Sequence, residues 1–280
     1  MNSQESQLIE SFVESSEKDF ENIFVDYYFC GSRLDDSSNQ NSDLDLILVV
    51  DKDVDIEIQK AFGDFLNDFN TYPIIETCTF DLRDLETLPA WAKNAKHIHG
   101  VDSFQNIPLE SIEQSRHRFI HGVYRFLYIF LRDSAEQLQY PLPLPDKNSE
   151  FYGYTIQQTD FGFSLKRFVS ATARICGALL ALHHDYQAVS KKDSILQYAE
   201  KSEDGFSEFV LHCYSTISKK WDYNLPTDRS DLTKLHLLLR DFNLFENYFL
   251  VQVSQYMQSQ RDLKLQDSWF IKCEEMIKLS

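Results

Sequence analysis

Asp43 and Asp45 are the residues of this sequence that best fit metal chemistry, since a single residue separates them just before the apolar run 46–50. In a β-strand, residues i and i+2 point to the same face, so the two carboxylates would project side by side. Carboxylates held this close repel each other unless a cation lies between them. Their hard oxygen atoms suit Mg²⁺, which usually retains several waters and completes its coordination shell with substrate phosphates. We therefore predict a Mg²⁺ site at this pair.

Gly31 and Ser32 follow the strand-like residues 25–29, and ten residues separate Ser32 from Asp43. Glycine lets the backbone approach a phosphate closely, serine adds a hydroxyl donor, and such a turn can bind anions through its N–H groups. Taken alone, Gly-Ser usually marks a turn and Asp-x-Asp a solvated strand edge. The combination of strand, turn, loop and aspartate pair favours a site for phosphate and metal.

Gly31-Ser32, the ten-residue spacer and Ser42-Asp43-Leu44-Asp45-Leu46 resemble the signature of the DNA polymerase β-type nucleotidyltransferase superfamily. The resemblance implies transfer of a nucleoside monophosphate from a nucleoside triphosphate to an acceptor, usually a hydroxyl, with two Mg²⁺ ions. It also implies that Gly31, Ser32 and Ser42 bind the nucleotide. With ATP as co-substrate, the product would be an adenylylated acceptor.

A third carboxylate is expected on the predicted strand 74–80, either to share a metal or to take the proton of the attacking hydroxyl. The candidates are Glu76 within the strand and Asp81 just after it. Glu76 has apolar and β-branched neighbours, where a carboxylate is costly without a partner. Ile75-Glu76-Thr77 also resembles the strand of aminoglycoside adenylyltransferases that carries the general base. The alternative is that Glu76 lies on a solvated sheet face, with Asp81 as the third carboxylate.

A second resemblance covers residues 160–199, where Arg174-Ile175, Ser190-Lys191-Lys192-Asp193 and Tyr198-Ala199 look like the C-terminal domain of AadA-type aminoglycoside (streptomycin/spectinomycin) adenylyltransferases. It implies that Arg174 and Lys192 reach the triphosphate, with Lys191 as the alternative to Lys192. Phosphoryl transfer needs positive charge around the departing pyrophosphate, which agrees with this assignment. Both could equally be ordinary surface cations.

The acceptor is indicated less clearly. Asp160 occupies the place of an acidic residue that binds the cationic drug in the aminoglycoside enzymes. A second acidic position of those enzymes is Ser164 here, and Phe161 replaces a Trp. An aminoglycoside is therefore one candidate among small hydroxylated, cationic acceptors.

Periodicity places these residues in an α+β protein. We expect a nucleotidyltransferase domain over residues 1–107, with a mixed sheet and helices, and an α-helical bundle over 108–280. Strands are predicted over 25–29, 43–50 and 74–80. Helices are predicted over 4–23, 56–69, 112–131, 163–184, 192–201, 205–219, 229–258 and 265–278. Residues 82–107 read as loops with a short helix, His97 and His99 as surface histidines without an acidic partner, and 140–145 as an inter-helix connector.

Composition limits the function classes. The 280 residues carry a net charge of −17, which disfavours a protein that grips long nucleic acid. The charge suits a cationic small acceptor, and the default alternative is that it serves only solubility. Five scattered cysteines without metal spacing indicate reduced thiols in a cytoplasmic protein. No signal peptide or membrane-spanning run is expected.

The sequence therefore predicts an Mg²⁺-dependent enzyme that transfers AMP from ATP to a small-molecule hydroxyl, as in antibiotic resistance. One alternative is a nucleotidyltransferase of toxin–antitoxin type that modifies a protein or tRNA. Arg116 and His121, with four residues between them, weakly resemble a motif of the helical ribonuclease domains that accompany such enzymes, but we read them as one exposed arginine and one partly buried histidine. The other alternative is a non-catalytic nucleotide-binding module.

Overall fold

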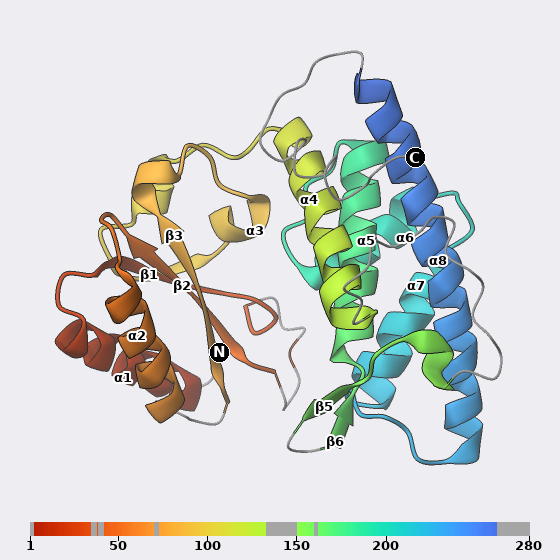
Figure 1. Cartoon of the computed structure of the whole chain (residues 1–280), viewed down its shortest axis with the longest axis horizontal. Coiled ribbons are helices and arrows are strands. Elements are labelled where there is room, and N and C mark those ends of the chain that lie inside the picture. Colours follow the sequence, from red (N-terminus) through yellow and green to blue (C-terminus); the bar gives the residue numbers. More distant parts are fainter. Residues whose placement is uncertain are drawn as a thin grey trace. The chain divides into compact units, whose positions relative to one another are not determined.

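The computed structural model describes residues 3–34, 38, 42–69, 73–132, 150–159 and 162–261. The chain forms two compact units, Met1–Glu110 and Ser111–Ser280 (Figure 1). The first contains a mixed four-stranded sheet with helices, and the second is built mainly from helices. The predicted α+β fold class is thereby confirmed. No helix in the described ranges is both long enough and apolar enough to cross a membrane.

The first unit has four strands and several helices. In chain order they are α1 (Ser3–Asp19), β1 (Phe24–Cys30), β2 (Leu44–Val50), α2 (Ile56–Asp68), β3 (Ile75–Asp81), η1 (Leu82–Asp84), α3 (Ala90–Lys93), β4 (Lys96–Gly100) and η2 (Ser103–Asn106). The sheet order is β3-β2-β1-β4. β1 is antiparallel to both β2 and β4, whereas β2 is parallel to β3. The parallel pair is possible because α2 carries the chain back between the two strands.

The two faces of this sheet bury different cores because side chains alternate along β1 and β2. α1 and α2 cover one face (Figure 1), and that core includes Phe12, Tyr27, Phe29, Leu44, Leu46 and Leu48. The opposite face packs around α3 and η2, and that core includes Tyr28, Cys30, Ile47, Val49, Ala92 and Phe104. Because of this alternation, Asp45 lies on the face that α1 and α2 do not cover.

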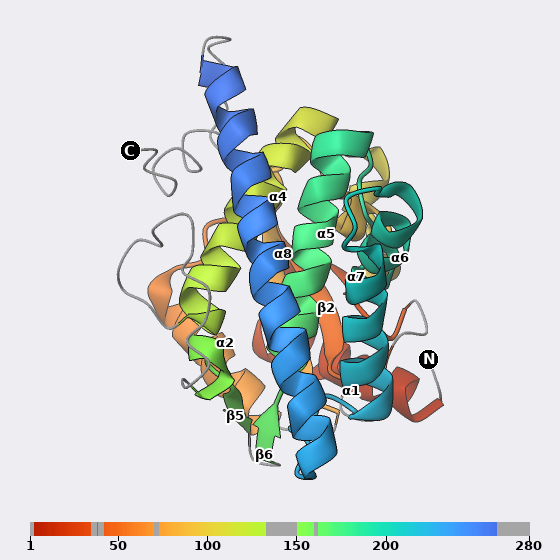
Figure 2. The same cartoon turned by 90° about the vertical axis from the view of Figure 1, so that its right-hand side faces the viewer.

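The second unit is organised around a buried helix. Its elements are α4 (Ile112–Phe126), η3 (Leu127–Leu131), η4 (Glu150–Gly153), β5 (Gln157–Thr159), β6 (Gly162–Ser164), α5 (Lys166–His184), α6 (Lys191–Lys201), α7 (Ser207–Tyr214), η5 (Ser215–Lys220) and α8 (Arg229–Arg261). α5 packs against α4, α6, α7 and α8 (Figure 2). Small residues on α5 allow this close packing; a Cβ on Gly177 would come 2.9 Å from the ring of Phe119 and 3.3 Å from Ser194 Oγ.

Several predicted boundaries were wrong. The helix predicted over 4–23 ends at Asp19, and Asn22 adopts a left-handed conformation that turns the chain toward β1. The helix predicted from residue 163 begins at Lys166, because residues 162–164 pair with 157–159 as a hairpin. The region 82–107 contains β4, which was missed because its sequence, Lys-His-Ile-His-Gly, lacks a strand-like apolar pattern. The predicted elements at 140–145 and 265–278 lie outside the described residues.

Candidate functional site

Three carboxylates meet at one end of the sheet in the first unit. Asp43, Asp45 and Glu76 each offer an oxygen atom, and these oxygens lie within 4.8 Å of one another. Asp45 on β2 pairs with Glu76 on β3 in the parallel register, and Asp43 lies two residues before Asp45. Asp43 and Asp45 are partly exposed and Glu76 is exposed. The parallel pairing of β2 with β3 therefore brings Glu76, which is distant in sequence, to the aspartate pair.

The donor set of this cluster fits a hard divalent cation. Like charges this close raise the energy of the ionised state unless a cation offsets them, and three carboxylates are ligands that Mg²⁺ prefers. Cys30 pairs with Asp45 on the other side of β2. Burial, followed by the negative charge of Asp45, raises the pKa of the Cys30 thiol well above its ordinary value. The thiol therefore stays protonated at neutral pH, and the anionic ligands of the site are oxygen atoms. In the described part of the chain, no other group of three His, Cys, Asp or Glu side chains converges in this way.

Gly31 is required at this site for two independent reasons. Its φ is +83°, a conformation that side chains disfavour. A Cβ at this position would also lie 1.9 Å from Asp45 Oδ2. The turn continues with a hydrogen bond from Leu34 N to Gly31 O at 3.1 Å. The turn containing Gly31 and Ser32 thus lies directly against the carboxylate of Asp45.

Arg33 is a neighbour of the cluster that sequence reasoning missed. Its Nε donates to the carbonyl oxygens of Ser42 and Asp43, at 3.0 and 3.2 Å. Ser42 itself is buried. The available signal was the position of this arginine directly after Gly31-Ser32, but no acceptor could be assigned to it from sequence.

The structure separates the two candidates for the third carboxylate. Asp81 is the last residue of β3, five residues beyond Glu76 and hence about 17 Å along an extended strand. Its carboxylate binds Arg83, whose hydrogen bonds lower the pKa of Asp81. Glu76 is exposed on the edge strand β3, so the expectation that its neighbours would make the carboxylate costly was wrong. Glu76 joins the cluster through strand pairing instead.

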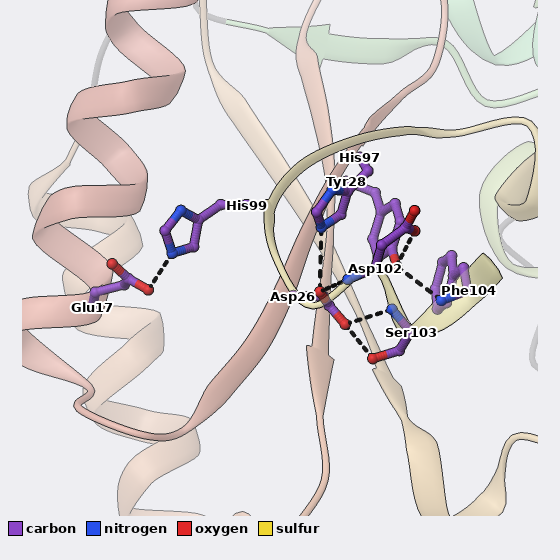
Figure 3. A network of polar contacts seen from close by, with 8 residues as sticks. All are labelled: Glu17, Asp26, Tyr28, His97, His99, Asp102, Ser103 and Phe104. Carbon is purple, nitrogen blue, oxygen red and sulfur yellow. Dashed lines mark hydrogen bonds and ion pairs between the residues drawn. The ribbon is translucent and has the colours of Figure 1, made fainter. Parts of the chain in front are cut away.

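The interpretation of His97 and His99 as histidines without acidic partners was also wrong. His97 Nε2 lies 3.3 Å from Asp26 Oδ1, and His99 Nε2 lies 2.8 Å from Glu17 (Figure 3). Asp26 is fully buried and accepts hydrogen bonds from the main chain of Asp102 and Ser103. The contacts with Asp26 attach β4 and the following turn to β1, and the pair with Glu17 attaches β4 to α1, so both histidines have a structural role.

The predicted phosphate-binding cations belong to the second unit. Arg174 lies on the surface of α5, with its guanidinium carbon 4.9 Å from the centre of the Phe126 ring. Lys191 and Lys192 are the first two residues of α6, a helix capped by Ser190, whose side chain accepts from Asp193 N. Positive side chains at a helix N-terminus form a suitable environment for an anion.

Two further residues can be placed. Arg116 donates to the carbonyl oxygen of Ala181 at 2.8 Å and pairs with Asp185, so it fastens α4 to the end of α5. Arg116 is therefore partly buried, whereas we expected an exposed arginine from the sequence. Asp160, the predicted acceptor-binding residue, lies outside the described residues.

Comparison with known proteins supports the fold. No protein-family model matches the chain, and no curated protein matches its sequence. Among solved structures, the chain is similar to spectinomycin adenyltransferase AAD(9) from Enterococcus faecialis, which was crystallised with ATP and spectinomycin. The match covers 85% of this chain and 98% of that chain, with a TM-score of 0.53 and 12% sequence identity. At this identity, what the two proteins share is the fold.

Proposed function

We propose that this protein is a Mg²⁺-dependent nucleotidyltransferase that transfers AMP from ATP to a hydroxyl of a small-molecule acceptor. The observation that carries the proposal is the convergence of Asp43, Asp45 and Glu76 beside the turn at Gly31. The fold similarity to an adenyltransferase solved with ATP is consistent with this chemistry.

In the proposed reaction, the acceptor oxygen attacks the α-phosphorus of ATP. A new P–O bond forms, the bond from the α-phosphorus to the bridging oxygen breaks, and pyrophosphate leaves. Asp43 and Asp45, with Glu76, would hold two Mg²⁺ ions, which when bound neutralise phosphate charge and favour ionisation of the acceptor hydroxyl. Glu76 is the candidate base for the hydroxyl proton, because it is the exposed member of the cluster.

Residues outside the cluster would position the two substrates. We assign the nucleotide phosphates to Gly31, Ser32, Ser42, Arg174 and Lys192. Asp160 is the proposed contact for a cationic acceptor. Aminoglycosides are the first class to test, since the similar protein was solved with spectinomycin. The reaction would take place in the cytoplasm, where ATP and Mg²⁺ are abundant.

The proposal is tested by a screen for pyrophosphate release from ATP with aminoglycosides and other hydroxylated small molecules, followed by mass spectrometry of the acceptor. We expect an acceptor whose mass increases by one AMP. Asp45→Asn should lower the rate by about 100-fold or more, because it removes a charge from the cluster. Asp81→Asn is the matched control: it lies on the same strand as Glu76, binds Arg83, and should retain activity.

Other outcomes would reject the proposal in distinct ways. Transfer of AMP to a protein or to tRNA, with no small acceptor, would favour the toxin–antitoxin type. Binding of ATP that is independent of Mg²⁺ and unchanged in Asp45→Asn would favour a non-catalytic binding module, and isothermal titration measures this directly.

A further inference from the structure

We infer that Arg33 is a positioning residue for the carboxylate cluster: its guanidinium holds the main chain at Ser42 and Asp43 so that the Asp43 carboxylate meets Asp45 and Glu76. This inference rests on the proposed function for what the cluster binds. The contacts that support it lie entirely within the first unit.

The guanidinium of Arg33 binds three acceptors at once. Nε donates to the carbonyl oxygens of Ser42 and Asp43, and a terminal nitrogen donates a second hydrogen bond to the Ser42 carbonyl. The other terminal nitrogen forms an ion pair with Glu5. Because a guanidinium is planar and its donors point in fixed directions, these contacts define one geometry for the peptide ahead of β2.

Glu5 connects this arrangement to the core. It lies in the first turn of α1, a helix whose Phe12 is fully buried against the sheet. The side chains of Arg33 and Glu5 are only 10% and 9% exposed. A buried ion pair of this kind is costly to break, because removing one partner leaves a charge without compensation. The position of the Ser42–Asp43 peptide is therefore coupled to the packing of α1 through Glu5 and Arg33.

An arginine directly after a Gly-Ser turn could instead contact a nucleotide phosphate. The described contacts disfavour that role, because all three nitrogens of the Arg33 guanidinium donate to Ser42, Asp43 or Glu5 and its side chain is only 10% exposed. The two roles predict different measurements. A positioning residue alters the affinity of the cluster for a metal in the absence of nucleotide, whereas a phosphate ligand alters the affinity for ATP.

The test measures the Kd of the nucleotide-free full chain for Mn²⁺. Electron paramagnetic resonance reports the concentration of the free ion during the titration. Arg33→Lys keeps the charge but cannot reproduce the planar set of donors, and we expect its Kd for Mn²⁺ to rise about tenfold, as for other residues that orient metal ligands. Glu5→Gln should shift the Kd in the same direction. Arg83→Gln is the matched control, because Arg83 pairs with Asp53 and Asp81 in the same unit, and its Kd should stay at the wild-type value.

Steady-state kinetics provide the second readout. In Arg33→Lys, the Mg²⁺ concentration for half-maximal rate should rise while kcat at saturating Mg²⁺ recovers and the KM for ATP is unchanged.

Wild-type Mn²⁺ affinity in a folded Arg33→Lys protein would overturn the inference, as would a raised KM for ATP at saturating metal. If wild type itself binds no Mn²⁺, or Asp45→Asn binds it equally well, the proposed function fails instead. Arg33→Lys and Glu5→Gln are preferred to Arg33→Ala because both preserve side-chain volume, and thermal unfolding of each variant verifies that it is folded.

Discussion

At the scale of single residues, the cluster depends on how closely Gly31 approaches Asp45. The α-carbon of Gly31 occupies a position where any side chain would overlap the Asp45 carboxylate. Gly31 thus has two effects: it allows the turn conformation, and its lack of a side chain leaves room for the Asp45 carboxylate beside Asp43 and Glu76. The two contributions can be separated experimentally, because the chain contains other glycines with positive φ.

We expect Gly31→Ala to weaken Mn²⁺ binding by about tenfold or more, because the new methyl group displaces Asp45, a proposed direct ligand. Gly205→Ala is the control. Gly205 has a similar φ of +87°, but a Cβ there would have nothing within 4 Å. Both variants should lose roughly 1–2 kcal/mol of unfolding free energy from the strained backbone, as measured by urea denaturation. If both variants bind Mn²⁺ with equal affinity, the contact with Asp45 does not matter.

At the scale of elements, the sheet depends on a buried acidic side chain on β1. Asp26 is fully buried and accepts hydrogen bonds from the N–H groups of Asp102 and Ser103, at 2.7 and 3.0 Å (Figure 3). Tyr28 adds a hydrogen bond from its hydroxyl to Asp102 and accepts one from Phe104 N. These contacts hold the end of β4 and η2 against the sheet. They lie on the same face as Asp45 of the carboxylate cluster.

Asp26→Asn should destabilise the protein by about 1–3 kcal/mol, since an amide can accept at only one of the two former oxygen positions and leaves the part-buried N–H of Asp102 or Ser103 without its acceptor. Glu17→Gln makes the same chemical change at the exposed pair with His99 and should cost less than about 1 kcal/mol. Urea denaturation measures both values. Equal losses would show that burial of Asp26 is not what gives the network its strength.

At the scale of the whole molecule, the proposed reaction draws on both units. The carboxylates are in the first unit, and the proposed phosphate-binding cations Arg174 and Lys192 are in the second. The chain carries a net charge of −17, so positive charge near a triphosphate has to come from particular side chains and from bound cations. Arg174 is suited to this role because it is exposed and its guanidinium is supported by the ring of Phe126.

Arg174→Gln should raise the KM for ATP about tenfold or more, because hydrogen bonds to charged groups contribute about 1.5–3 kcal/mol. Arg167→Gln is the control on the same helix. Arg167 also stacks on an aromatic ring, that of Phe130 at 5.2 Å, and donates to the Phe130 carbonyl. Its loss should leave the KM for ATP near the wild-type value. Equal effects of the two substitutions would indicate a general dependence on charge rather than a contact with phosphate.

The sequence by itself determined the local features of the site. Period-two spacing predicted that Asp43 and Asp45 project side by side, and the apolar residues that follow predicted a strand of the sheet. That strand begins at Leu44, so Asp45 lies within it and Asp43 directly before it. The helices of the second unit were also readable, because a long apolar helix such as α5 has a strong periodic pattern. These properties depend on residues close together in the chain, so local spacing is sufficient to predict them.

Tertiary structure alone decided which distant residues meet the aspartates. Parallel pairing selected Glu76 over Asp81, and no local pattern encodes the register of two strands joined through a helix. The same is true of Arg33 and Glu5, whose contact depends on how α1 packs on the sheet, and of β4, whose polar residues are satisfied by Asp26 and Glu17. Spacing along the chain specifies which groups a segment presents, and only packing specifies the partners that those groups find.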